Sequence, residues 1–139
     1  MFQQTIVMGN LGGDPEIRFM QDGKAVTNFS VATNRKWKDA NGETAEEVTW
    51  FRVSVWGNQA EACNEYLKKG SAVLVIGRLK PDPTSGGPKL WSRDDGSMGA
   101  NFEIVGQNVR FLPASDIEGS GGSPSSRSRP VVEEDEIPF

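Results

Sequence analysis

The stretch V-T-W-F-R-V-S-V-W, residues 48–56, decides how the rest of this chain is interpreted. In an extended strand, successive side chains point to opposite faces. One face then carries the residues that suit burial, which are Thr49, Phe51, Val53 and Val55. The other face carries Trp50, Arg52, Ser54 and Trp56. Rings beside a cation suit single-stranded nucleic acid, because bases stack on the rings and phosphates pair with Arg or Lys. A strand buried on both faces, or packed against another subunit, is the alternative, and this stretch alone leaves both open.

Length and composition restrict the class of protein. A chain of 139 residues is long enough for one domain with a hydrophobic core. Its 16 glycines and 36% hydrophobic residues favour short strands and turns over long helices. One cysteine and no histidine exclude an internal disulfide framework, an ordinary zinc site and a histidine base. The chain has no apolar run of about 18 residues and its start lacks signal-peptide features, so a cytoplasmic protein is expected.

The net charge of −4 means that nucleic-acid binding would require clustered positive charge. The densest basic cluster is R-K-W-K at residues 35–38, in which Arg35, Lys36 and Lys38 surround Trp37. Asn41-Gly42 follows as a hairpin signal, which predicts a cationic arm leading into residues 48–56. A solvated loop with the tryptophan packed on lysine stems is the alternative.

The pattern predicts a chain of short strands. They are expected at residues 5–11 (broken or bulged at Gly9), 16–20, 25–33, 48–56 and 73–79, with a last strand or strand pair at 101–105 and 108–112. Asp22-Gly23 is typical of a tight hairpin with a type I′ turn. Residues 81–89, P-D-P-T-S-G-G-P-K, are expected to protrude as a loop, because Pro and Gly do not suit a central strand. The loop leads to a further tryptophan beside a cation, Trp91 with Arg93.

One helix is expected, over residues 58–69. Asn58 can cap it, with Glu61 completing a capping box. The apolar stripe of this helix is Ala62, Cys63, Tyr66 and Leu67, which predicts a buried structural thiol. Lys68 and Lys69 would then lie at the negative end of the helix dipole, with Gly70 ending the helix.

The order of these elements predicts the fold class. Strand, hairpin, hairpin, helix, strand and final hairpin is the succession of an OB-fold, a five-stranded Greek-key barrel with its helix between the third and fourth strands. The protein is therefore expected to be all-β. In this barrel the face with Trp50 and Trp56 would be flanked by the arm at residues 35–38 and by the Trp91 loop. Rings and cations would then line one continuous groove for single-stranded nucleic acid.

The composition changes after Leu112, which predicts three regions: residues 1–114 as the OB-fold domain, 115–132 as a flexible Gly/Ser/Pro linker and 133–139 as a disordered acidic tail. Acidic tails are usually solubilising, but that role does not need a terminal Ile-Pro-Phe. We interpret the end as a peptide ligand, with Phe139 entering a pocket of a partner. The expected partner-binding residues are Asp135, Glu136, Ile137, Pro138 and Phe139.

Several of these segments together resemble the bacterial and phage single-stranded DNA-binding protein family. The matching pieces are V-M-G-N-L-G-G-D-P-E-I-R-F-M, F-S-V-A-T-N, R-K-W-K, T-W-F-R-V-S-V-W-G-N-Q-A-E, E-Y-L-K-K-G-S-A-V-L-V-I-G-R-L and D-E-I-P-F. The resemblance covers about residues 1–112 and the last seven or so. It implies an OB-fold homotetramer that wraps single-stranded DNA in replication, recombination and repair. It also implies that the tail docks partner enzymes and that the protein is associated with the nucleoid.

The resemblance also implies residue roles. Trp37, Trp50 and Trp91 match stacking tryptophans, and Trp56 matches a stacking aromatic that is often Phe. Arg18, Arg52, Lys68 and Lys69 match phosphate-contacting cations. We add Arg35, Lys36, Lys38, Arg78 and Arg93 to the expected DNA-binding residues from their positions in the sequence.

Three features depart from the family pattern. Phe51 stands where some members carry a histidine associated with tetramer stability, so subunit contacts there are expected to differ. Residues 81–89 lengthen the loop before Trp91, and the linker is short.

Catalytic motifs are missing from the sequence. It has no phosphate-binding loop motif, no zinc spacing and no nucleophile elbow, and Asp94-Asp95 suits a turn better than a magnesium site. We therefore expect a binding protein that is not an enzyme and uses no cofactor or metal. Two other classes fit part of the pattern: an OB-fold carbohydrate binder, which would not need R-K-W-K or the tail, and an interaction module whose tryptophan-rich faces are subunit interface.

Overall fold

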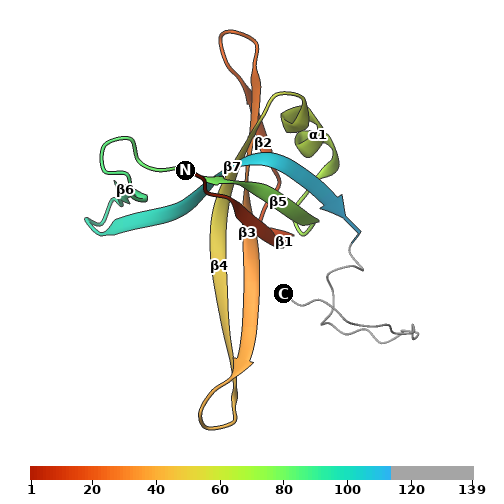
Figure 1. Ribbon diagram of the computed structural model, residues 1–139. Coiled ribbons are helices and arrows are strands. Elements are labelled where there is room, and N and C mark those ends of the chain that lie inside the picture. Colours follow the sequence, from red (N-terminus) through yellow and green to blue (C-terminus); the bar gives the residue numbers. More distant parts are fainter. Residues whose placement is uncertain (114–139) are drawn as a thin grey trace.

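The computed structural model describes residues 1–113. The elements in chain order are β1 (Thr5–Leu11), β2 (Glu16–Phe19), β3 (Ala25–Lys38), β4 (Thr44–Trp56), α1 (Asn58–Tyr66), β5 (Ala72–Leu79), β6 (Lys89–Ser92) and β7 (Met98–Leu112). Strands dominate this part of the chain, and its single helix lies between β4 and β5 (Figure 1).

The sheet closes on itself as a barrel. Its strand order is β1-β5-β7-β4-β3-β2, and β1 also pairs with β3. β1 and β2 together serve as the first strand of the barrel, while β6 pairs only with β7. The β4–β7 pair is parallel and the other pairs are antiparallel. This closed five-stranded barrel with one helix is the OB-fold that the sequence predicts, so the fold class is confirmed.

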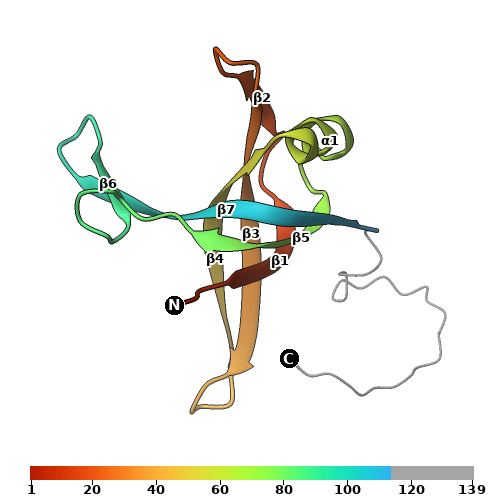
Figure 2. The same cartoon turned by 45° about the horizontal axis from the view of Figure 1, so that its top comes forward.

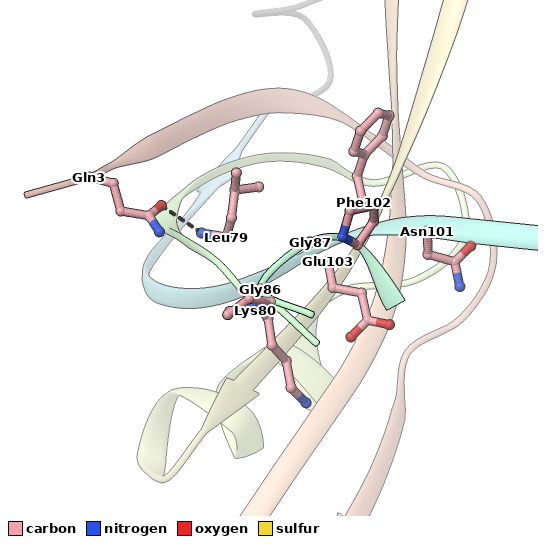
Figure 3. Close-up of a pocket in the computed structure, with 10 residues that line it drawn as sticks. Gln3, Leu79, Lys80, Gly86, Gly87, Asn101, Phe102 and Glu103 are labelled. Atoms are coloured by element: carbon pink, nitrogen blue, oxygen red, sulfur yellow. Dashed lines mark hydrogen bonds between the residues drawn. The ribbon is translucent and has the colours of Figure 1, made fainter. Parts of the chain in front are cut away.

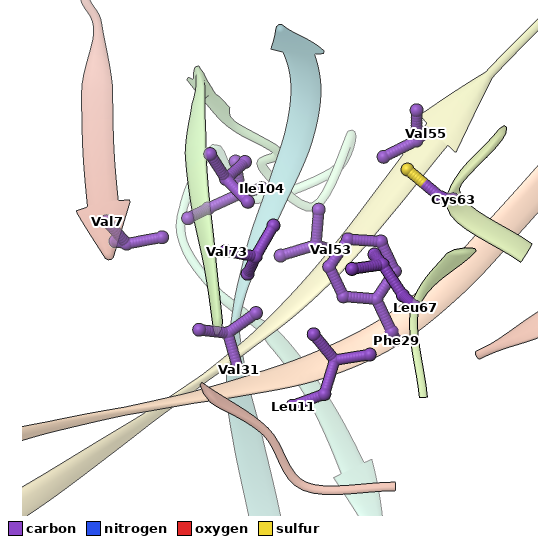
Figure 4. Close-up of a cluster of buried hydrophobic side chains, with 11 residues drawn as sticks. Val7, Leu11, Phe29, Val31, Val53, Val55, Cys63, Leu67, Val73 and Ile104 are labelled. Carbon is purple, nitrogen blue, oxygen red and sulfur yellow. The ribbon is translucent and has the colours of Figure 1, made fainter. Parts of the chain in front are cut away.

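The core fills the barrel mainly with branched aliphatic side chains, together with Phe29 (Figure 4). Val53 and Val55 of β4 are fully buried, as the alternation in residues 48–56 predicts, and Phe51 packs at the margin. They meet Val31 and Ile104 from neighbouring strands. β-Branched residues suit these positions because their stiff side chains pack well on a pleated surface.

Three hairpins extend beyond the barrel (Figures 1 and 2). The longest is the β3–β4 arm, in which pairing continues without interruption from Val26–Trp56 to Lys38–Thr44. Both strands are longer than expected from the sequence, because the basic cluster at residues 35–38 belongs to β3 itself. A hairpin ladder continues for as long as cross-strand hydrogen bonds form, whether or not a core lies beneath it.

The tight-hairpin prediction at Asp22-Gly23 is correct in position but wrong in turn type. The Gly23 amide donates to the Met20 carbonyl (2.9 Å), so the turn spans residues 20–23 and Gly23, with φ of 89°, is its last residue. A two-residue type I′ turn would instead place Asp22 and Gly23 at the two central positions. The turns at Gly42 and Gly96 are closed by the same kind of hydrogen bond.

Strands β1 and β7 also differ from expectation. β1 runs unbroken through Gly9, where an added Cβ would collide with the Ala32 carbonyl of β3. Glycine is needed there because two backbones approach closely as the barrel closes. β7 is one strand rather than two, with Gln107 as the extra residue of a bulge between the Ile76–Asn108 and Gly77–Gly106 pairs.

The helix is shorter than predicted, and its capping box is not formed. α1 ends at Tyr66, its N-cap is Gly57, and no side chain caps it. Gly57 has φ of 79°, which turns the chain into the helix one residue earlier than expected. Leu67 is extended and buried, so filling the core ends the helix and leaves Tyr66 exposed. Lys68 and Lys69 therefore lie in a turn after the helix, which Ser71 closes by donating to the Lys68 carbonyl (2.9 Å).

Candidate nucleic-acid interface

The outer face of β4 is open to solvent. Across the β3–β4 ladder, Trp50 pairs with Ala32, Arg52 with Ser30, Ser54 with Asn28 and Trp56 with Val26. Three of these neighbours are small or polar and the fourth is Val26, and the two indoles stay 53% and 44% exposed. The Ser54 hydroxyl donates to the Asn28 side-chain oxygen (2.7 Å). Burial of this strand on both faces within the chain is therefore excluded.

The same outer face continues onto β7, β5 and β6. Arg52 pairs with Glu103 of β7, and the next outward residue, Val105, pairs with Arg78 of β5. Gly99 lies further along the same side of β7, because strand residues alternate between faces. Trp91 of β6 pairs with Gly99. Trp50, Trp56 and Trp91 thus share one face although they lie in distant parts of the sequence.

Two of these rings pack against the backbone of a glycine. A Cβ added to Gly12 would lie 2.5 Å from Cζ3 and 2.8 Å from Cη2 of Trp50, so the indole packs directly on the Gly12 backbone. Trp91 packs in the same way on Gly99, where an added Cβ would lie 2.6 Å from Cζ2. With the Asn101 amide oriented to satisfy both of its polar atoms, the Trp91 indole N–H donates to the Asn101 oxygen (3.2 Å). Glycines hold both rings in defined positions.

Trp37 does not share this face. The β3–β4 register has no shift, so Trp37, paired with Ala45, and Arg35, paired with Glu47, point to the side opposite Trp50. Lys36 and Lys38 alternate with them and point to the same side as Trp50. The basic cluster at residues 35–38 is therefore divided between the two faces of the arm. One continuous groove containing all four tryptophans, as the sequence suggested, is not formed on a single face.

Arginines cover two of the four rings. The Arg35 guanidinium lies 4.5 Å from the centroid of Trp37, and the Arg93 guanidinium lies 4.7 Å from that of Trp91. Arg35 is also ion-paired to Glu47 (Nη1 to Oε2, 3.3 Å), whereas Arg93 donates to the Ser97 hydroxyl (3.2 Å) and the Met98 carbonyl (2.8 Å). These contacts fit cation–π geometry.

The remaining cations predicted to contact phosphate are unpaired. Within residues 1–113, Arg35–Glu47 is the one ion pair. Arg18 of β2 pairs with Val26 of β3, which pairs in turn with Trp56, so Arg18 lies on the same face as Trp56, two strands away. The Lys69 amide donates to Asp14 (2.9 Å), which brings Lys68 and Lys69 to the corner where Gly12 supports Trp50. Arg52 and Arg78 extend from the centre of the face.

Sequence reasoning missed Gly12, Gly99 and Asn101. The Asp95-Gly96 turn contained a signal for Gly99, because a hairpin centred there places residue 99 opposite residue 91. Gly12 and Trp50 are separated by 38 positions, and no local pattern connects them. The partner-binding residues 135–139 and the linker lie outside the described residues.

The loop over residues 81–88 covers a cavity of about 320 Å³ at the edge of β7 (Figure 3). It is the protruding loop predicted from the sequence, and Asp82 organises it by accepting hydrogen bonds from the Thr84 (2.7 Å) and Ser85 (3.3 Å) amides. Phe102 lines the cavity, and Figure 3 shows Phe102 and Glu103 leaving β7 on opposite sides. Gln3 accepts a hydrogen bond from the Leu79 amide (3.0 Å) at its rim.

The chemistry of the described residues suits binding. Among residues 1–113, no group of three or more His, Cys, Asp or Glu is placed to hold a metal ion. Burial raises the pKa of the Cys63 thiol from its ordinary 9.0 to about 11, so the thiol stays protonated near neutral pH. The predicted structural role of Cys63 agrees with its complete burial. In the same part of the chain, no helix is both long and apolar enough to cross a membrane.

Comparison with known proteins identifies the family. Residues 2–112 match the single-strand binding protein family. The chain belongs to this family. Members of the single-strand binding protein family are non-enzymatic DNA-binding proteins, which agrees with the expectation that the chain is not an enzyme.

Two relatives with the same name illustrate the relationship. The single-stranded DNA-binding proteins of Neisseria meningitidis serogroup A and serogroup B are each 37% identical to this chain over 121 residues. The match includes 87% of this chain and 65% of each relative, so the chain spans slightly less than two thirds of their length.

Solved structures of this family have the same fold. A Plasmodium falciparum SSB, solved as a complex with ssDNA, superposes with a TM-score of 0.67 at 27% identity, over 81% of this chain and 97% of that chain. A deletion mutant of the single-stranded DNA binding protein from Thermus aquaticus gives a TM-score of 0.61 at 24% identity, over 79% of this chain and 50% of that one. The second likeness concerns the fold alone.

Proposed function

We propose that this protein binds single-stranded DNA without sequence preference through the outer face of β4 and its neighbours. The observation that carries the proposal is the gathering of three exposed tryptophans and unpaired arginines on one face. Bases stack on Trp50, Trp56 and Trp91, with Trp37 as a further platform on the other side of the arm. Phosphates are contacted by Arg18, Arg35, Lys36, Lys38, Arg52, Lys68, Lys69, Arg78 and Arg93.

Stacking supplies most of the affinity in this proposal. Base–aromatic stacking contributes roughly 1–3 kcal/mol per base in proteins of this class and tolerates any base. The net charge of −4 does not prevent binding, because Arg52 and Arg78 present local positive charge where phosphates would pass. The Ser54–Asn28 hydrogen bond occupies polar groups of the same face and favours a surface without base-specific readout.

A fluorescence titration with poly(dT) tests the proposal. Stacking should quench the tryptophan emission strongly, and a flat titration would refute single-stranded DNA binding. Trp50→Ala should weaken binding to any base sequence by about 1–3 kcal/mol, since one platform is lost. A loss confined to one base would contradict a sequence-independent surface.

We further propose that the protein assembles as a homotetramer. Ile6 and Met8 of β1 are exposed and pair with Ile76 and Leu74 of β5, which makes an apolar outer face on these two strands. Within the described residues, β1 pairs with β3 only at Asn10 and Leu11, so the edge of residues 5–8 is free to pair with another copy. Mass measurement in solution tests the assembly, and Met8→Glu should dissociate it. A variant that stays tetrameric would contradict the proposed contact.

The tail is proposed to recruit proteins of DNA replication, recombination and repair in the cytoplasm, at the nucleoid. Support comes from the sequence D-E-I-P-F at residues 135–139, which combines acids with an apolar ring. Deleting residues 133–139 should preserve or slightly raise DNA affinity and abolish partner capture. Retention of the same partners by the shortened chain would refute this role.

A further inference from the structure

The Trp37 side of the β3–β4 arm differs from the side that carries Trp50. Trp37, Arg35 and Glu47 lie on one face of this two-stranded ribbon, away from Trp50. The Arg35 guanidinium is 4.5 Å from the Trp37 ring centroid and 3.3 Å from the Glu47 carboxylate. One side chain therefore contacts the ring and the acid together.

This arrangement makes Trp37 unlike the other platforms. Trp50 and Trp56 carry no guanidinium among the cation–π contacts of residues 1–113, and Trp50 is 53% exposed against 37% for Trp37. Trp91 has an arginine on its ring, but neutral Ser97 and Met98 groups hold that arginine. A base cannot stack on the ring surface that Arg35 occupies until the guanidinium moves.

We propose that Glu47 is a positioning residue that keeps Arg35 on Trp37 and so closes this platform in the free protein. The proposal rests on the single-stranded DNA binding proposed above. A phosphate replaces the Glu47 carboxylate as the partner of Arg35, the guanidinium leaves the ring, and a base takes its place. Carboxylate and phosphate compete for one cation, because both accept hydrogen bonds from a guanidinium in the same geometry.

Glu46 offers a matched control. It is adjacent in sequence, carries the same charge and accepts a hydrogen bond from Asn34 across the ribbon (3.1 Å), but by alternation it points to the opposite face. Glu46→Gln and Glu47→Gln thus remove the same charge from the same strand. Only Glu47→Gln releases Arg35.

The experiment is a set of (dT)n titrations of both variants, each in the wild-type chain and in a Trp37→Ala chain, with thermal melts to confirm folding. Both variants should bind more tightly as a negative charge is lost. The gain in affinity for (dT)n should be about two- to fivefold larger for Glu47→Gln than for Glu46→Gln, because loss of an exposed ion pair shifts an equilibrium by about this factor. This difference between the two variants should be smaller in the Trp37→Ala chain, because the released arginine then has no Trp37 ring to uncover for a base.

Two results would overturn the inference. Equal effects of the two variants would show that Glu47 acts only as a negative charge. An excess unchanged by Trp37→Ala would show that Glu47 competes for Arg35 without closing the ring. Failure of the wild-type chain to bind (dT)n would instead refute the proposed function itself, so the two failures are distinguishable.

Discussion

Gly12→Ala tests whether the packing of Trp50 against Gly12 matters for DNA binding. The new Cβ would lie 2.5 Å from Cζ3 and 2.8 Å from Cη2 of the indole. Carbon atoms in contact are separated by about 3.5–4.0 Å, so the ring must move by roughly 1 Å. Gly12 lies outside the left-handed region, and the alanine backbone is therefore unstrained. Trp50 is half-exposed and can lift away at little cost to the fold.

The expected cost falls on affinity rather than stability. Removing a stacking platform altogether costs roughly 1–3 kcal/mol, which sets the upper limit. A displaced ring keeps part of its stacking, so we expect Gly12→Ala to weaken (dT)n binding by about 1 kcal/mol, or about fivefold. The melting temperature should change little. Fluorescence titration gives the first quantity and circular dichroism the second.

Two controls isolate the ring. An added Cβ at Gly13 would meet nothing within 4 Å, so Gly13→Ala should bind like the wild type. In a Trp50→Ala chain, Gly12→Ala should have no further effect, because the ring that it displaces is absent. Equal affinities of Gly12→Ala and Gly13→Ala for (dT)n would refute the importance of the contact between Trp50 and Gly12. A loss that persists without Trp50 would show that Gly12 acts through another group.

Three further predictions concern the barrel and its charges. Gly77→Ala should lower the free energy of unfolding, measured in urea, by about 1–3 kcal/mol, because its Cβ would collide with the Val105 carbonyl at the bulge. Gly87→Ala is the control, since the nearest contact of its Cβ would be 3.7 Å away. Equal free energies of unfolding for the two variants would contradict the β5–β7 register. Burial raises the pKa of Cys63 in the folded protein from 9.0 to about 11, so the stability that this thiol contributes is complete below pH 9 and is lost as pH rises toward 11. The free energies of unfolding measured in urea at pH 8 and pH 10.5 should therefore differ less in Cys63→Ala than in the wild type. An identical pH dependence in both chains would argue against this assignment. Arg52→Gln should reduce the slope of log K against log salt by about 0.7, the value for one phosphate contact on a single strand, whereas an unchanged slope would remove Arg52 from the phosphate path.

The candidate site was predictable in its parts. Alternation in residues 48–56 assigned Trp50 and Val53 to opposite faces correctly, since side-chain direction in a strand repeats every two residues. The helix end was not predictable in the same way. Leu67 leaves the helix to enter the core, and that burial competes with local capping preferences.

The amino-acid sequence by itself indicated the order of the barrel strands and the helix, the OB-fold and the two faces of β4, because these follow from residue patterns along the chain. The short strand β6 was not predicted. The tertiary structure alone decided which tryptophans act together. Trp91 joins Trp50 through the β7 register, Gly12 supports Trp50 across 38 positions, and Trp37 turns away with Arg35 and Glu47. Such relations depend on barrel closure and on the register in which each pair of strands aligns. A shift of that register by one residue would move every side chain of the strand to the opposite face.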